Sequence, residues 1–337
     1  MYRGIGIWLC LACFYFSQVT TQTGQAQIFT ETFGNDANQF SIPFVTVGNP
    51  GNVADPNGFP YWKGKNPGSV NYEYAIGKYE ITRGDIEKAN GLGNTGISLY
   101  ELTYATWGGL KKPATGISWN EAARFVNFLN TSQGYMPAYK FTESGANTNI
   151  SLWSLGDPGY NPNNPFRNQL SKYVIPDVDE WHKAAFFNPA NNSYSIYADG
   201  TTNLPNAIVG GLQGVVYNQP NDLNHGPADV DDAGSLSVYG TMAQTGNALE
   251  WLETSYDLYN DSPLDKRIFR GGSWVDNDQF IWPFTNTGGG SLDPDIEYFH
   301  VGFRVASVPE PSRRVLIVLG LLLQAIMARS GNTRKKQ

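Results

Sequence analysis

Thiol chemistry is confined to the first residues of this 337-residue chain. Its two cysteines, Cys10 and Cys13, both lie in an apolar run close to the N-terminus. If that run is removed as a signal peptide, the mature chain has no thiolate to act as a nucleophile or to bind a soft metal ion, and no disulfide can form. Copper is therefore not expected as a cofactor.

The three histidines do not form a metal-binding pattern. His182, His225 and His300 are far apart in the sequence, and none belongs to a paired motif such as His-x-x-x-His. We expect His182 to face solvent from a helix. The sequence also lacks the Gly-x-Ser-x-Gly motif of serine hydrolases and the glycine-rich loop that binds phosphate. No catalytic residue is assigned for these reasons.

Oxygen ligands for a hard cation are gathered in one loop. The segment Asp229–Gly234 has the sequence DVDDAG, which places three carboxylates beside a glycine. Calcium takes about six to eight oxygen ligands from carboxylates and carbonyls. A solvated acidic turn is an equally good interpretation, because the spacing of an EF-hand is absent.

Composition places the chain among loop-rich exported proteins. Glycine (37) and proline (20) are frequent and charged residues make up only 16%, which is unlike a helical cytosolic enzyme. Between Gln27 and Ser312 the chain has 16 basic and 30 acidic residues, hence a net charge of −14. Such a charge disfavours nucleic acid and anionic polysaccharide as partners.

Both ends of the chain carry export signals. Residues 1–26 combine Arg3, a short apolar run, and small residues at Gly24 and Ala26, which is the layout of a secretory signal peptide. A lipoprotein signal with an acylated Cys13 is the alternative. At the other end, residues 308–337 begin with Val-Pro-Glu-Pro-Ser, continue with an apolar segment at 315–328, and end in a basic tail.

This C-terminal arrangement resembles the bacterial Pro-Glu-Pro (PEP-CTERM) sorting signal, which an exosortase-type membrane protease recognises and cleaves. The apolar segment is shorter than the roughly 20 residues that cross a bilayer comfortably. The basic tail is expected on the cytoplasmic side. We therefore expect the body of the protein in the periplasm, at the cell surface or outside the cell, anchored transiently or permanently, with the sorting protease as a partner.

Two helices and several short strands are expected between these ends. Capping boxes begin at Ser118 and at Asp177, each with a glutamate three residues later. The first helix is expected to reach about Leu129, and the second to cover the segment DEWHKAAF. Alternation in Val70–Thr82 predicts a half-buried strand. Residues 27–70 are expected to form an N-terminal extension of strands and loops.

Three further segments share glycines and aromatic residues. Thr245–Leu252 reads TGNALEWL, Ile268–Trp274 reads IFRGGSW, and Val301–Val305 reads VGFRV. The second segment predicts a strand that runs into a tight bend, where glycines let backbones approach closely. Together the three segments resemble the signature of the formylglycine-generating enzyme (sulfatase-modifying factor) family. IPDVDEWHKAAF and YAIGKYEITRGDI are similar to two further family segments.

The resemblance covers about Tyr72 to Ala306 and implies the fold of the family. This is an α+β fold of the C-type-lectin-like kind, loop-rich, with two main helices and short twisted sheets. The corresponding domain is expected to span residues 71–307. The core of the family motif corresponds here to Arg270, Gly271, Gly272, Ser273, Trp274 and Arg304.

The resemblance also identifies the positions at which the family performs its chemistry. Its oxidases bind copper(I) through two cysteines that follow RGGSW, and they convert a substrate cysteine into formylglycine. These positions correspond to Asp276 and Ile281. A carboxylate is a hard ligand and an isoleucine is none, so neither replaces a thiolate.

The family also binds structural calcium beside the segment GN-x-WE. The resemblance implies ligands at Gly246, Ala248 and Glu250, although Ala243 stands where the family has a further side-chain ligand. The alternative is a buried ion pair between Glu250 and either Arg270 or Arg304, which specifies a structure more surely than it stabilises one.

Aromatic residues are the remaining candidates for contacts with a ligand, because flat rings stack on sugars. Most tryptophans stand at core positions of the family, so packing is the expected role of Trp119, Trp181, Trp251 and Trp274. The aromatic residues of variable-looking loops are kept as ligand-binding candidates. These are Trp153, Tyr160, Trp282 and Phe284.

Three functional hypotheses follow from these residues. The first is an exported, surface- or matrix-associated binding or structural protein, which is not an enzyme and lacks the catalytic cysteines of the family. The second is a protein-modifying oxidase of the family that works without thiols. The third is an extracellular carbohydrate-binding module with an extracellular polysaccharide as its partner.

Overall fold

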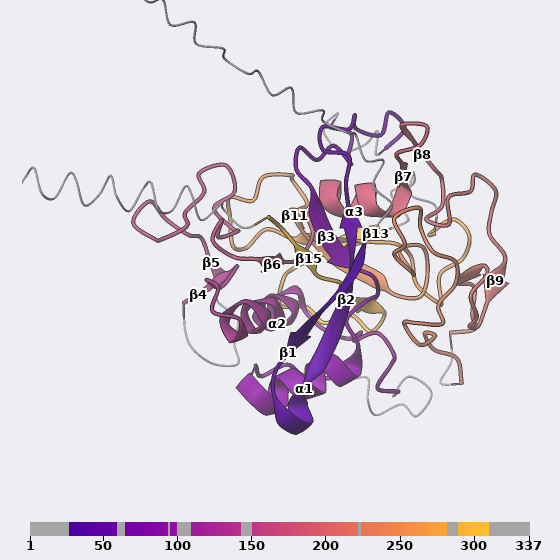
Figure 1. The fold of residues 1–337 in the computed structure, drawn as a ribbon. Helices are drawn as coiled ribbons and strands as arrows, with labels where there is room; N and C mark the ends of the chain where they lie inside the picture. Colours follow the sequence, from indigo (N-terminus) through magenta and orange to yellow (C-terminus); the bar gives the residue numbers. More distant parts are fainter. Residues whose placement is uncertain are drawn as a thin grey trace, which may run out of the picture.

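A computed structural model of the chain describes residues 27–58, 65–93, 95–99, 109–142, 150–221, 224–281 and 289–309. It shows a loop-rich α+β fold in which helices and small sheets surround one large apolar core (Figure 1). The expected signal peptide at 1–26, the apolar segment at 315–328 and the candidates Trp282 and Phe284 lie outside these residues. Within the described ranges, every helix is too short or too polar to cross a membrane.

The largest sheet has five strands in the order β1-β2-β3-β15-β6. These strands are β1 (Ile28–Phe33), β2 (Phe40–Val47), β3 (Tyr74–Gly77), β15 (Ala306–Ser307) and β6 (Tyr173–Val174). β1 and β2 form an antiparallel hairpin around the short 3-10 helix η1 (Asp36–Asn38), and β2 pairs with β3. The N-terminal extension therefore adds two strands to the main sheet.

A second sheet, in the order β13-β12-β11-β14, carries the three motif segments. Its strands are β11 (Leu249–Ser255), β12 (Arg267–Arg270), β13 (Gly289–Leu292) and β14 (Val301–Gly302). All seven residues of β11 are buried. This strand lies between antiparallel β12 and parallel β14, and its Glu250 stands opposite both Arg270 and Gly302. Segments that are distant in the sequence thus become adjacent strands.

Three α-helices pack around these sheets. They are α1 (Arg83–Gly93), α2 (Trp119–Ser132) and α3 (Val178–Phe186). Both predicted capping boxes are confirmed, since the side chains of Ser118 and Asp177 accept the backbone N–H of the residue three positions later, and each glutamate binds back. α1 directly follows Thr82 in the segment YAIGKYEITRGDI, for which the family resemblance implies a strand that leads into a helix, and it adds to the two main helices that the sequence predicted.

The strand predicted at Val70–Thr82 is shorter than expected, because only β3 pairs. From the end of β3 onward the backbone still bonds to its neighbour, with Gly77 N–H donating to the carbonyl of Val305 at 2.7 Å and Ile81 N–H to that of Phe303 at 2.9 Å, but not in a regular ladder. At the end of the segment, the Asp85 backbone N–H donates to Thr82 Oγ1 at 3.1 Å, and the Thr82 N–H donates to the Asp85 carboxylate at 3.0 Å. These reciprocal bonds form the start of α1. Thr82 itself makes a single isolated β-bridge, to Pro113.

The remaining strands form three small pairs at the periphery. They are β4 (Lys140–Phe141) with β5 (Ile150–Ser151), β7 (Phe187–Asn188) with β8 (Ser193–Tyr194), and β9 (Ala207–Ile208) with β10 (Val215–Val216). Long connections between them supply most of the surface loops (Figure 1). These loops are where the fold has room for binding sites.

The expected packing role of four tryptophans is confirmed. Trp119, Trp181, Trp251 and Trp274 are at most 2% exposed. The Trp119 indole N–H donates to the carbonyl of Leu252 at 2.9 Å, and the Trp251 indole N–H donates to the carbonyl of Ile117 at 2.8 Å. These two bonds fix the start of α2 against the central strand β11, which positions the sites described below.

The expectation that His182 faces solvent is wrong. Its side chain is 1% exposed, and its Nε2 lies 2.9 Å from an Asp55 carboxylate oxygen. The reason is that the N-terminal segment covers this face of α3, as the Lys183 ammonium donating to the carbonyl of Asn49 at 2.9 Å also shows. The residue pattern of a helix does not show that a distant segment packs over its polar face.

Candidate functional site

The bend after β12 has the tight geometry that the RGGSW segment predicted. Gly271 and Gly272 have positive φ angles of 111° and 75°, which disfavour any residue with a Cβ. A Cβ at Gly272 would lie 2.8 Å from Ile281 Cγ2 and 3.1 Å from the carbonyl of Phe280. The bend therefore brings the segment at 280–281 directly against the motif.

Beside this bend, Glu250 forms a buried ion pair with Arg304. Both side chains are fully buried, and Arg304 Nε donates to the Glu250 carboxylate at 2.6 Å while a terminal nitrogen binds the other oxygen. The Trp181 indole N–H donates to the same carboxylate at 2.7 Å. Of the two ion pairs that the sequence left open, the structure shows the one with Arg304.

The calcium ligands implied at Gly246, Ala248 and Glu250 stay a prediction. The Glu250 carboxylate already binds a guanidinium, which neutralises the charge that calcium would use. The Ala248 N–H donates to a second buried carboxylate, Glu80, at 3.1 Å. Burial, and then the charge of Glu250, raise the pKa of Glu80 well above its ordinary value.

Asp276 and Ile281, the two positions at which the resemblance implies cysteines, do not fit copper(I). The Asp276 carboxylate accepts both the backbone N–H and the hydroxyl of Ser273 at 2.7 Å. Ile281 is 3% exposed and packs in a small apolar cluster with Tyr197, Val215 and Tyr217. Copper(I) prefers soft ligands, whereas Asp276 offers a hard, hydrogen-bonded oxygen and Ile281 offers only a hydrocarbon side chain.

His300 is a histidine that packs against this motif. His300 is 8% exposed, and its ring packs against Trp274, Tyr298 and Phe299. Burial lowers the pKa of His300, while the charge of Asp276 acts in the opposite direction. An imidazole beside one carboxylate does not reproduce a pair of thiolates, so the copper centre of the family has no counterpart in these residues.

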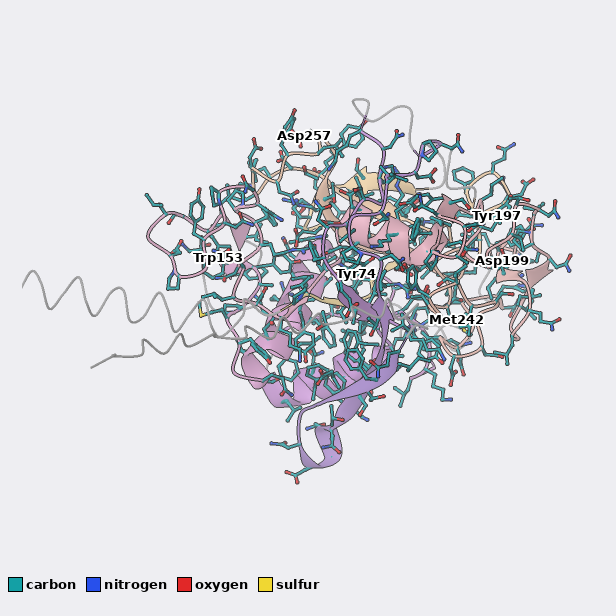
Figure 2. The ribbon with its side chains drawn as sticks, turned by 45° about the horizontal axis from the view of Figure 1, so that its top comes forward. Tyr74, Trp153, Tyr197, Asp199, Met242 and Asp257 are labelled. Carbon is teal, nitrogen blue, oxygen red and sulfur yellow. The ribbon has the colours of Figure 1, made fainter. Side chains whose placement is uncertain are left out.

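The aromatic ligand candidates are separated by the fold. Trp153 is 7% exposed and its indole N–H donates to the carbonyl of Ala138 at 3.0 Å, so little of its ring faces solvent. Tyr160 is half-buried in the loop that follows. Figure 2 shows Trp153 and Tyr197 on opposite sides of the molecule, so the Trp153 loop lies far from the Ile281 cluster.

That loop instead helps to form a polar pocket with a volume of about 230 Å³. Four segments of the chain meet there: Lys65–Pro67, the loop at 163–164, the N-terminus of α3, and the end of β11 with the loop that follows it. The polar lining includes Asn163, Asn164, Asp177, Asp179, Thr254 and Asn260. We refer to it below as the α3 pocket.

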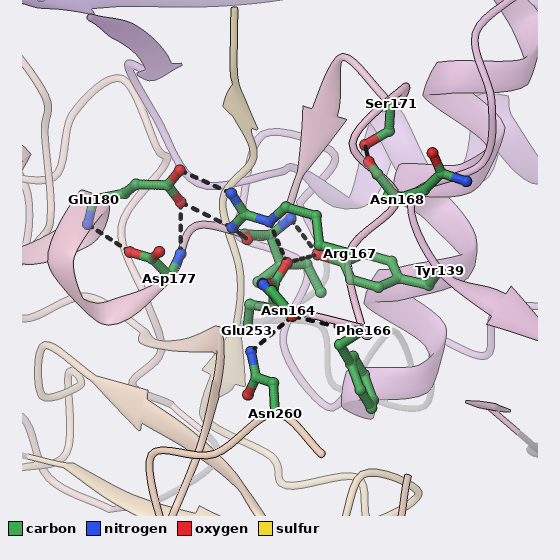
Figure 3. A network of polar contacts seen from close by, with 12 residues as sticks. Tyr139, Asn164, Phe166, Arg167, Asn168, Ser171, Asp177, Glu180, Glu253 and Asn260 are labelled. Atoms are coloured by element: carbon green, nitrogen blue, oxygen red, sulfur yellow. Dashed lines mark hydrogen bonds and ion pairs between the residues drawn. The ribbon is translucent and has the colours of Figure 1, made fainter. Parts of the chain in front are cut away.

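A buried charge network supports the α3 pocket (Figure 3). Arg167 binds Glu180 at 2.9 Å and Glu253 at 2.7 Å, and both carboxylates are fully buried. The Asn164 amide donates to Glu253 at 2.7 Å. Although burial acts in the opposite direction, the two carboxylates raise the pKa of Arg167 well above its ordinary value. Burial and then Glu180 raise the pKa of Asp177 in turn.

Sequence reasoning did not identify the residues of the α3 pocket as a site. Only Asp177 and Glu180 had a signal, as a helix cap. Arg167 and Glu253 are single charged residues in the sequence, and their partners lie on different segments. The run DPGYNPNNPFRN, rich in Asn and Pro, is the one local feature that indicates an ordered polar loop.

Two acidic clusters lie on the described surface, the second of them in the loop that also lines the α3 pocket. In the Asp229–Gly234 turn, Asp229 and Asp231 pair with Lys112 and Lys111 at 3.2 and 2.9 Å, as expected of a solvated acidic turn. After β11, three aspartates bring carboxylate oxygens within 4.8 Å of one another: Asp257, Asp261 and Asp265. Figure 2 shows Asp257 at the edge of the molecule.

Small twisted sheets, extended ordered loops and the joined RGGSW, GN-x-x-E and GFR segments define an α+β domain of the C-type-lectin-like kind. The chain belongs to the formylglycine-generating family: the model of the sulfatase-modifying factor enzyme 1-like domain matches residues 51–308. No curated protein matches the chain.

Solved structures share the fold at low sequence identity. Treponema denticola variable protein 1 is 18% identical with a TM-score of 0.56, over 83% of this chain and 99% of its own. CarF is 19% identical with a TM-score of 0.54, over 80% and 98% of the two chains. PvdO from Pseudomonas aeruginosa is 16% identical with a TM-score of 0.51, over 83% and 98%. These likenesses concern the fold alone.

Proposed function

We propose that this chain is an exported binding protein of the cell surface or extracellular matrix, which uses the fold of the family without its copper chemistry. The sequence supports the proposal because residues 27–337 contain no cysteine. The geometry of the motif supports it as well, because its bend is filled by packing and hydrogen bonds between the residues of this chain.

The single observation that carries the proposal is the place of Ile281. Its side chain lies in an apolar cluster and against the backbone of Gly272. The tight bend of RGGSW thus serves to pack a hydrocarbon at the position where the family has a metal-binding thiol. Asp276 is held by Ser273 in the same way, as a structural hydrogen bond acceptor.

Export and sorting complete the proposal. Residues 1–26 act as the signal peptide, and residues 308–337 as the sorting signal for an exosortase-type protease. Mass spectrometry of the protein recovered from the cell surface tests this part. We expect an N-terminus near Gln27 and, after sorting, a C-terminus near the Pro-Glu-Pro motif; an intact chain retained in the cytoplasm contradicts it.

An oxidation assay tests the loss of the family activity. The full chain is incubated with copper, oxygen, a reductant and a cysteine-containing peptide, and an aldehyde-reactive probe then reports formylglycine. We expect no aldehyde above the level of a sample without protein. Aldehyde formation that depends on the protein would overturn the proposal and favour a thiol-independent oxidase.

A further inference from the structure

We infer that the α3 pocket binds a neutral polyhydroxylated ligand, such as a sugar unit of an uncharged extracellular polysaccharide. This inference rests on the proposed binding function and assigns it a place. The α3 pocket lies beside Thr254, whereas the RGGSW bend lies beside Glu250. Four residues of a strand separate these positions by roughly 13 Å, so the α3 pocket is distinct from the RGGSW bend.

The α3 pocket presents polar groups that the fold leaves available. The Thr254 hydroxyl oxygen accepts the Val178 N–H at 2.9 Å, which leaves its O–H able to donate. One Asp177 carboxylate oxygen accepts the Glu180 N–H at 2.8 Å, while the other has no partner within the described ranges. The exposed Asn163 carboxamide makes no hydrogen bond there either.

These groups combine donors with acceptors, which suits hydroxyl groups. A carboxamide both donates and accepts, a threonine hydroxyl donates, and a carboxylate accepts. A sugar hydroxyl can donate and accept at once, so neighbouring hydroxyls can satisfy all three kinds of group. The volume of about 230 Å³ is below the ~300–1,000 Å³ of pockets for drug-sized molecules, which suits one sugar unit better than a large ligand.

The walls of the α3 pocket are held rigidly before any ligand arrives. The Asn164 amide donates to Glu253, and Asn260 accepts the Ser255 N–H at 3.0 Å and an Arg267 guanidinium N–H at 2.9 Å. Both asparagines are therefore fixed by the network that contains Arg167. A site whose groups are already ordered loses less conformational entropy on binding.

Charge distinguishes a neutral ligand from a charged one. An anion is disfavoured by the net charge of −14 between residues 27 and 312, and by the three aspartates of the adjoining loop. Of the two carboxylates that line the α3 pocket, Asp179 is already paired with Lys65 at 3.2 Å, which leaves the pocket a single carboxylate for a cation.

Within the described ranges, the lining of the α3 pocket contains no aromatic ring. Tyr259 is 58% exposed and lies in the chain between Leu258 and Asn260, which both line the pocket, but Tyr259 itself is not part of the lining. The polar groups therefore carry the recognition of the ligand.

Binding of the full chain to an array of oligosaccharides tests the inference. The array contains neutral oligomers of glucose, galactose, mannose and N-acetylglucosamine, with heparin as the anionic probe. The strongest neutral oligomer is then titrated by calorimetry into the wild type and three variants. Asn163→Ala and Asp177→Asn change the α3 pocket, and asparagine keeps the helix cap. Asn203→Ala changes an equally exposed asparagine elsewhere.

We expect a neutral oligomer to bind, and each pocket variant to bind it roughly tenfold more weakly through the loss of one hydrogen bond. Asn203→Ala should bind like the wild type, and all melting temperatures should agree. A blank neutral array, a preference for heparin, or unchanged binding by both pocket variants would overturn the inference. The proposed function fails when the oxidation assay detects aldehyde that depends on the protein. The binding assays do not measure aldehyde, so failure of this inference and failure of the proposed function are read out separately.

Discussion

Arg304 binds the Glu250 carboxylate through two guanidinium nitrogens, and both side chains are fully buried. This ion pair joins the GFR segment to β11. The same guanidinium donates to the backbone carbonyls of Gly77 and Met242 at 2.9 and 2.8 Å. One arginine thus binds groups from three other parts of the chain. Its position gives the GFR segment a structural role that does not depend on a metal ion.

The ion pair predicts a large loss of stability when only one partner is removed. Arg304→Met leaves the buried Glu250 carboxylate without its partner, which should lower the free energy of unfolding by roughly 3–5 kcal/mol. Urea denaturation measures this change. In the matched double variant Arg304→Met, Glu250→Gln, most of the loss should be recovered. A single variant that loses less than about 1 kcal/mol would contradict the buried pair.

The ion pair also predicts the outcome for calcium. Because Glu250 is neutralised by Arg304, the melting temperature should be the same with and without a calcium chelator. Differential scanning calorimetry of the full chain checks this, with metal analysis of the same sample. One calcium ion per chain and a lower melting temperature after chelation would instead support the ligands implied at Gly246, Ala248 and Glu250, by linkage of binding to folding.

Gly272 should be intolerant of a side chain for two separable reasons. Its φ of 75° is in the left-handed region, and a Cβ would clash with Ile281. Gly134 is the matched control, because its φ is 79° but nothing lies within 4 Å of its Cβ position. We expect Gly134→Ala to cost about 1 kcal/mol, and Gly272→Ala to cost clearly more in urea denaturation. Equal losses would show that the approach of Ile281 is not tight.

Lys183 predicts a pH dependence of stability. Burial lowers the pKa of this ammonium from 10.5 to about 8 in the folded protein. Between these two values the unfolded chain binds the proton more strongly, so the stability of the wild type should rise with pH in that interval. The Lys183→Met variant lacks this titration. As the pH rises from 8 to 10.5, the unfolding free energy of the wild type should therefore increase relative to that of the variant. A constant difference would contradict the shifted pKa.

Much of the fold was predictable because its signals are local. The capping boxes at Ser118 and Asp177 depend on residues three positions apart, and the glycines of RGGSW signal a bend by their own conformational freedom. The resemblance then supplied the fold class, a loop-rich α+β domain of the C-type-lectin-like kind with short sheets. The early end of β3 escaped prediction, because the residues from Gly77 onward bond to Phe303 and Val305 irregularly, and alternation in the sequence does not distinguish this from a ladder.

The α3 pocket was not predictable in the same way, because it depends on contacts between distant segments. Arg167 meets Glu180 and Glu253 only after the loop, the helix and β11 are assembled. His182 was misjudged for the same reason: Asp55, which covers it, is more than a hundred residues away in the sequence. Trp153 resembled a loop aromatic, yet its indole is held inward by Ala138.

The most direct test of the central claim is the affinity of the full chain for copper(I). A chromogenic copper(I) chelator competes with the protein under reducing, oxygen-free conditions, with the double variant Asp276→Cys, Ile281→Cys as the comparison. We predict that the chelator takes all the copper from the wild type, because Asp276 and Ile281 provide no soft ligand. One copper(I) ion per chain withheld by the wild type would contradict the account and restore the oxidase hypothesis.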